Sequence, residues 1–220
     1  MVFVVVPAYN EETKIGRVVR GLFEHGYRQV IVVDDGSKDH TAKLAAEAGA
    51  IVLSHEINRG QGAALQTGDE YALKNGATAV VHFDGDEQFN PTDIAGAILA
   101  LQVSHTNVVL GSRFLDDRSR VPFIKRYLIL PVSRWINYIF TGVKLTDAHN
   151  GFRVLDALAL SKIKITQDGM AHNSEIVHQI RQRGLKFIEY PVEVSYSEFG
   201  QGIGGGIKIL RDLVVGWVIK

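Results

Sequence analysis

Short apolar runs and helical patterns alternate through the first half of the chain. Runs rich in Val and Ile predict buried strands at 3–6, 30–33, 51–53, 78–83 and 108–110. Between them, apolar residues spaced three and four apart predict helices at 13–25, 40–48, 62–74 and 91–102. Strands this uniformly apolar, separated by helices, are typical of a mostly parallel sheet with helices on both faces. We therefore expect an α/β fold.

The second half of the chain is less regular. The pattern predicts a helix at 127–143, a turn at 147–153 before a short strand, a helix at 173–183, and an edge strand at 186–194. The charged segment 118–126 is expected to be a mobile flap, and the glycine-rich segment 200–206 a loop that closes on substrate. Residues 207–219 predict an amphipathic helix. We expect one domain over 1–196, followed by this loop and C-terminal helix over 197–220.

Polar turns, three of them with a glycine, follow four of the predicted strands, at 7–12, 34–37, 84–88 and 111–113. Ligands of open α/β sheets bind beyond the carboxyl ends of the strands. The four turns are therefore expected to form one site.

Two carboxylates follow the strand at 78–83. Asp84 and Asp86 are two apart, so on an extended backbone they point the same way and could share one hard cation. The alternative is an ordinary solvated acidic turn, because such a pair also arises by chance. The other polar turns favour the cation site.

Composition excludes several classes of function. Lys plus Arg (24) equals Asp plus Glu (24), which does not indicate a nucleic-acid partner. The absence of cysteine excludes disulfides and thiolate metal sites, and it fits a reducing cytosol. No apolar run reaches the roughly 18 residues that span a bilayer. We expect a cytoplasmic protein, with contact at most peripheral to the cytoplasmic face of a membrane.

Six motifs occur in a fixed order: PAYNEE at 7–12, VDDGS at 33–37, NRGQGAAL at 58–65, DGDEQ at 84–88, GSR at 111–113 and NGFR at 150–153. In this order they resemble family 2 glycosyltransferases, and within them the dolichol- or polyprenyl-phosphate sugar transferases. The resemblance covers about residues 2–196. It implies a GT-A fold, which is Rossmann-like, and an inverting transfer from a nucleotide-diphosphate sugar (UDP- or GDP-linked) with Mg²⁺ or Mn²⁺.

The resemblance also implies roles for individual residues. The donor would be bound by Pro7, Tyr9, Glu11, Asp35, Asp84 and Arg126. The metal and diphosphate would be surrounded by Asp84, Asp86 and Gln88, and Arg113 would hold phosphate charge. We name Asp86, Arg113 and Asp147 as the catalytic residues. Tyr9 could instead be a packed aromatic side chain, and Asp34 and Asp35 a helix cap and turn pair.

The chain departs from the family pattern in two places. Family members often have Lys where Gln61 stands, so one cation near the donor is missing. The last family element, an Arg-bearing loop before Gly-Ser-Lys, is replaced by the segment at 196–202.

The acceptor is less constrained than the donor. A hydroxyl acceptor needs a general base, for which Asp147 and Glu175 are the candidates, whereas a phosphate monoester is already largely ionised at neutral pH. This favours a lipid phosphate. Four basic residues before the aromatic-containing helix fit a lipid-facing surface: Arg118, Arg120, Lys125 and Arg126.

Several alternatives remain at this point. The acceptor could be a soluble or polysaccharide hydroxyl, or the chain could bind a nucleotide sugar without turnover. His149 and His172 could line the acceptor side, and His82 is expected to pack in the core.

Overall fold

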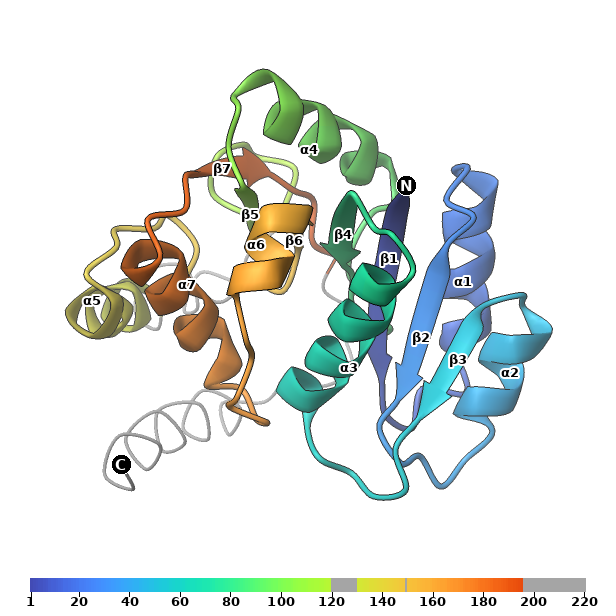
Figure 1. Ribbon diagram of the computed structural model, residues 1–220. Coiled ribbons are helices and arrows are strands. Elements are labelled where there is room, and N and C mark those ends of the chain that lie inside the picture. Colours follow the sequence, from blue (N-terminus) through green and yellow to red (C-terminus); the bar gives the residue numbers. More distant parts are fainter. Residues whose placement is uncertain (120–129, 149, 196–220) are drawn as a thin grey trace.

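The computed structural model describes residues 1–119, 130–148 and 150–195. Its elements follow one another in the order β1 (Val2–Ala8), α1 (Ile15–Glu24), β2 (Val30–Asp34), α2 (Thr41–Glu47), β3 (Ile51–Ser54), α3 (Gln61–Lys74), β4 (Ala79–His82), α4 (Thr92–Val103), β5 (Val108–Ser112), α5 (Leu130–Thr141), β6 (Arg153–Asp156), α6 (Ala157–Lys162), α7 (His172–Gln182) and β7 (Phe187–Pro191) (Figure 1).

One seven-stranded sheet runs through the molecule in the order β3-β2-β1-β4-β6-β5-β7. β3, β2, β1 and β4 are parallel to one another, and β7 is parallel to β5. β6 is antiparallel to both β4 and β5. The turn that precedes β6 therefore lies at the same sheet edge as the carboxyl ends of β4 and β5, which brings a late segment of the chain to the predicted site.

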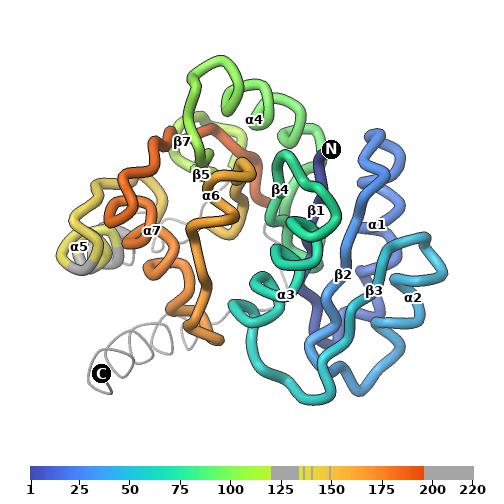
Figure 2. Tube along the Cα trace, in the orientation of Figure 1, coloured from blue at the N-terminus to red at the C-terminus, as the bar shows by residue number. Residues whose placement is uncertain are grey.

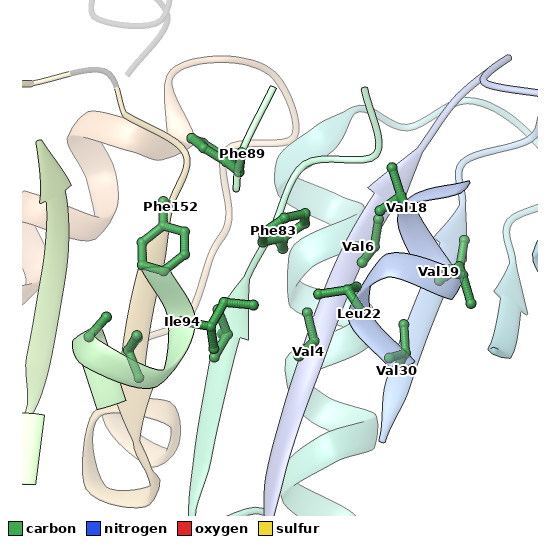
Figure 3. Packing of buried hydrophobic residues seen from close by; sticks show 14 of the residues in the cluster. Val4, Val6, Val18, Val19, Leu22, Val30, Phe83, Phe89, Ile94 and Phe152 are labelled. Atoms are coloured by element: carbon green, nitrogen blue, oxygen red, sulfur yellow. The ribbon is translucent and has the colours of Figure 1, made fainter. Parts of the chain in front are cut away.

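Helices cover both faces of the sheet. One core lies under α1, α2 and α4, and it includes the aromatic side chains Phe83, Phe89 and Phe152 (Figure 3). The other core lies under α3, α6 and α7. α3 lies very close to β1, because a Cβ at Gly68 would come within 2.3 Å of Val5 Cγ1. At the end of the sheet away from β3, α5 and α7 pack side by side (Figure 2).

The α1 helix forms as the sequence predicts. Its buried residues are Ile15, Val18, Val19 and Leu22, spaced three and four apart, and they pack in one core cluster with residues of the sheet. Figure 3 shows Val18, Val19 and Leu22 of this set. The predicted mostly parallel sheet is confirmed, and so is the edge position of the strand that holds Pro191.

In the segment predicted to be a mobile flap, Arg118 is bound to Asp93 and Asp116 at 2.6 and 2.7 Å, and 120–126 lie outside the described residues. The short helix α6 was not predicted; Asp156 caps it by accepting a hydrogen bond from the Ala159 N–H. The predicted loop and helix over 197–220 lie outside the described residues. Within the described ranges, no helix is long and apolar enough to cross a bilayer.

Candidate active site

Asp84 leaves the end of β4 and lies between two other segments. Its Oδ1 accepts a hydrogen bond of 2.9 Å from Gln61 Nε2 at the start of α3. On the other side it lies against Gly151, where a Cβ would come within 2.7 Å of Asp84 Oδ2. Glycine is therefore required at 151 for the carboxylate to keep this position.

The environment of Asp84 and Asp86 disfavours the ionised form of both carboxylates. Burial, and then the charge of Asp86, raise the pKa of Asp84 to about 7, against the opposing effect of Arg153. Burial also raises the pKa of Asp86. Among the described residues, no three His, Cys, Asp or Glu side chains form a metal cluster. A cation here would depend on this carboxylate pair and on oxygens of a ligand, which is how Mg²⁺ commonly binds. The residues present fit such a cation.

Neighbouring segments fix the shape of the loop at 84–88. Gln88 donates from its backbone N–H to Asp86 Oδ1 at 3.1 Å and from its side-chain amide to Asp86 Oδ2 at 2.5 Å. Glu87 adopts a positive φ of 65° and forms a bidentate ion pair with Arg17 on α1, at 2.5 and 2.7 Å. The Ser195 N–H donates to the Gln88 carbonyl at 2.9 Å. Gln88 is thus beside Asp86, as the motif predicts.

Arg113 and Asp147 form a single unit beside this loop. Arg113 donates from Nε and from a terminal nitrogen to the two oxygens of Asp147, at 2.6 and 2.7 Å. Burial alone would raise the pKa of Asp147, but the hydrogen bonds and charge of Arg113 outweigh it and hold that pKa below its ordinary value. Asn150 also donates to Asp147, at 3.3 Å. Such a carboxylate is a poor proton acceptor, so the geometry argues against Asp147 as a general base.

The predicted donor residues occupy different environments at the end of β1 and β2. Tyr9 is exposed and follows β1, whereas Pro7 is buried within that strand. Glu11 is half-buried, and burial raises its pKa. Both oxygens of Asp35 are occupied within the chain; they accept hydrogen bonds from the backbone N–H groups of Arg59 and Gly60 at 2.9 and 2.6 Å. Asp35 therefore holds the loop before α3 in place.

Other predicted residues lie away from the site or outside the described part. Glu175 accepts hydrogen bonds from the Thr166 and Gln167 N–H groups, so its carboxylate holds a loop and is not placed as a base. His172 is fully buried and does not line an open acceptor side. Arg126 and His149 lie outside the described residues.

A buried polar layer beneath Asp84 was missed by the sequence reasoning. Arg153 pairs with His82 across β6 and β4, and both side chains are almost fully buried. Arg153 donates to Asn173 Oδ1, and His82 hydrogen-bonds Asp69 at 2.9 Å. His82 thus belongs to a polar core. The signal was present in the NGFR motif, where an arginine opens an apolar strand.

A family model described as "Glycosyl transferase family 2" matches residues 3–165. The chain belongs to this family. It is a glycosyltransferase, and the carboxylate pair at the end of β4 lies within the matched residues.

Two relatives bear on the subclass. A UDP-N-acetylglucosamine–dolichyl-phosphate N-acetylglucosaminyltransferase of Methanococcus voltae is 30% identical over 95% of this chain and 91% of its own length. A polyprenol monophosphomannose synthase of Mycolicibacterium smegmatis is 26% identical over 99% of this chain and 86% of its own length.

Solved structures confirm the GT-A fold. Glucosyl-3-phosphoglycerate synthase from Mycobacterium tuberculosis, in complex with Mn²⁺, UDP and glucosyl-3-phosphoglycerate, superimposes with a TM-score of 0.76 at 17% identity. The match covers 99% of this chain and 78% of that structure.

Proposed function

We propose that this glycosyltransferase moves a sugar, with inversion, from a nucleotide-diphosphate sugar to a polyprenyl phosphate. The observation that carries the proposal is the pair Asp84 and Asp86 at the end of β4, whose pKa values are both raised. Asp84 lies against Gly151, and the neighbouring Asn150 donates a hydrogen bond to Asp147 of the Arg113–Asp147 pair. The names of two relatives, which act on dolichyl phosphate and polyprenol phosphate, support the acceptor class.

The donor is expected to lie across the carboxyl ends of β1, β2 and β4. Tyr9 and Glu11 would contact the nucleoside, and Asp84, Asp86 and Gln88 would hold the divalent cation. When bound, Mg²⁺ or Mn²⁺ supplies Lewis-acid stabilisation of the charge that develops on the leaving diphosphate. The protein's own part is to bring two carboxylates together in a partly buried site, where a bound cation relieves their repulsion.

The acceptor phosphate is expected to bind at Arg113. Asp147 holds the guanidinium of Arg113 at a fixed angle, which is the form of preorganisation that a phosphate site needs. A phosphate monoester with a second pKa near 6 needs no general base at neutral pH. Because Asp147 and Glu175 are both occupied by hydrogen bonds, this acceptor fits the described geometry better than a hydroxyl does.

Contact with a lipid surface is expected through α5. Trp135, Tyr138 and Ile139 lie on one side of this helix and are 66%, 43% and 56% exposed. Aromatic and aliphatic side chains exposed on one helix face are typical of interfacial helices. We therefore expect the protein to bind peripherally at the cytoplasmic face of a membrane.

A partition assay tests the acceptor class. A panel of radiolabelled UDP- and GDP-sugars is incubated with the protein, Mn²⁺ and either a polyprenyl phosphate or the corresponding polyprenol. Label should pass into the organic phase only with the phosphate. Label that enters the organic phase with the polyprenol, and not with the phosphate, would instead support a hydroxyl acceptor.

A further inference from the structure

Two basic side chains lie at the start of α1, near the loop at 84–88. Arg17, on α1, donates two hydrogen bonds of 2.5 and 2.7 Å to Glu87. Lys14 is the N-cap residue of α1 and precedes Arg17 by three residues, so the two side chains lie on one side of the helix start.

Lys14 lies among the acidic groups of the donor site. Its Nζ is 3.3 Å from Glu11 Oε2, and its side chain is 36% exposed. Its charge opposes the burial that raises the pKa of Asp86, and it adds to the effect of Arg17 that lowers the pKa of Glu87, so the ammonium lies within electrostatic reach of the loop. A single exposed ion pair of this kind contributes little to stability, so Lys14 can leave Glu11 at little cost.

On the opposite side of the carboxylate pair, the side chain that contacts Asp84 from the start of α3 is neutral. Gln61 stands there, and its neutral amide donates to Asp84 Oδ1. Arg153 is buried beneath Asp84 and is bound to Asn173, so it cannot move to a ligand. A donor diphosphate adds several negative charges to a site that already holds Asp84, Asp86 and Glu11.

We propose that Lys14 binds the diphosphate of the donor and supplies the positive charge that Gln61 does not. This inference rests on the proposed function, because it assumes a nucleotide-diphosphate donor. The ammonium of lysine is a compact charge on a flexible four-carbon stem, so Lys14 can leave Glu11 and follow the phosphate oxygens.

Calorimetric binding of UDP and GDP in the presence of Mn²⁺ tests the proposal. Lys14→Ala should weaken binding of the diphosphate about tenfold, the loss expected for a charge-assisted hydrogen bond. Binding of the phosphate-free nucleoside should stay unchanged. Lys14→Arg should recover most of the affinity. Lys43→Ala is the matched control, since Lys43 forms an exposed ion pair with Glu47 on α2 and should bind as the wild type does.

A second variant tests whether a cation at position 61 can replace the cation at position 14. Gln61→Lys, introduced into the Lys14→Ala protein, should restore diphosphate binding by placing a cation on the other side of Asp84. Unchanged diphosphate affinity in Lys14→Ala, or an equal loss for the nucleoside and the diphosphate, would overturn the proposal. If the wild type binds neither UDP nor GDP, the proposed function falls as well, so the two failures are distinguishable.

Discussion

Asp84 shows at the scale of a single residue how the site favours ligand binding over stability. Its carboxylate is partly buried and lies beside Asp86, and among the described residues it accepts one side-chain hydrogen bond, from the neutral amide of Gln61. Burying a carboxylate without a matching charge disfavours its ionised form. In the folded protein without metal, the ionised form of Asp84 is therefore expected to lower the free energy of unfolding.

Replacing Asp84 with a neutral residue should change the melting temperature of the protein in a pH-dependent way. The folded pKa of about 7 lies above the ordinary value of 3.8, so the stability linked to this group is present below about pH 4 and is lost as the pH rises through 7. In metal-free buffer, Asp84→Asn should melt about 5 °C higher than the wild type at pH 8 and nearly equally at pH 4. Calorimetric melting temperatures measure this. A variant less stable than the wild type at pH 8 would contradict the assignment.

The Arg113–Asp147 pair should act as one unit. If Asp147 works by fixing Arg113, the double variant Arg113→Gln with Asp147→Asn should lose no more kcat/KM than Arg113→Gln alone. A double-mutant cycle on sugar transfer measures the coupling. Additive losses would mean that Asp147 has a separate role in the reaction, such as proton transfer.

At the scale of elements, the loop after β4 forms backbone contacts with the segment that follows β7. Phe89 makes an isolated bridge with Val194, and its ring contacts those of Phe83 and Phe152 with centroids 5.7 Å apart in both cases (Figure 3). The aromatic cluster thus joins the carboxylate loop to β4 and to the turn before β6.

Truncating Phe89 should weaken both the fold and the cation site. Phe89→Ala should cost about 3–5 kcal/mol in urea unfolding and should also weaken the apparent Mn²⁺ affinity of the folded protein. Phe3→Ala is the control, because Phe3 is buried in the core on the other face of the sheet. It should cost similar stability with unchanged Mn²⁺ affinity. Equal effects of both variants on the metal would contradict the role of the cluster.

The sequence predicted individual helices and strands better than it predicted which strands pair and which side chains hydrogen-bond to one another. The apolar spacing of α1 and the valine-rich runs of β1 and β2 are short-range patterns, and the structure confirms them. The antiparallel insertion of β6 between β4 and β5 could not be predicted, because pairing depends on contacts between distant segments. For the same reason the sequence offered Asp147 and Glu175 as bases: only their hydrogen-bond partners show that both carboxylates are occupied.

At the scale of the whole molecule, the proposed lipid-facing helix lies at one end of the sheet. α5 packs against α7 (Figure 1). Its Trp135, Tyr138 and Ile139 side chains are exposed. The donor loops follow strands nearer the middle of the sheet, so a membrane could contact α5 while a nucleotide sugar reaches the site from the aqueous side.

Removing the exposed apolar side chains of α5 should reduce membrane binding. The double variant Trp135→Ser with Ile139→Ser should sediment several-fold less with anionic phospholipid vesicles than the wild type. The control is Leu99→Ser with Val103→Ser, which removes two exposed apolar side chains, 58% and 70% exposed, from α4. Equal losses for both double variants would mean that α5 has no special role.

The central claim is that the Asp84–Asp86 pair holds a divalent cation that activates the donor diphosphate. It is tested most directly by titrating sugar transfer with Mn²⁺ in the wild type, in Asp86→Ala and in the Lys43→Ala control. We predict saturable activation of the wild type and the control, abolished by a chelator, and loss of at least about a hundredfold in kcat/KM for Asp86→Ala. Full activity of Asp86→Ala, or of the wild type under chelation, would contradict the account.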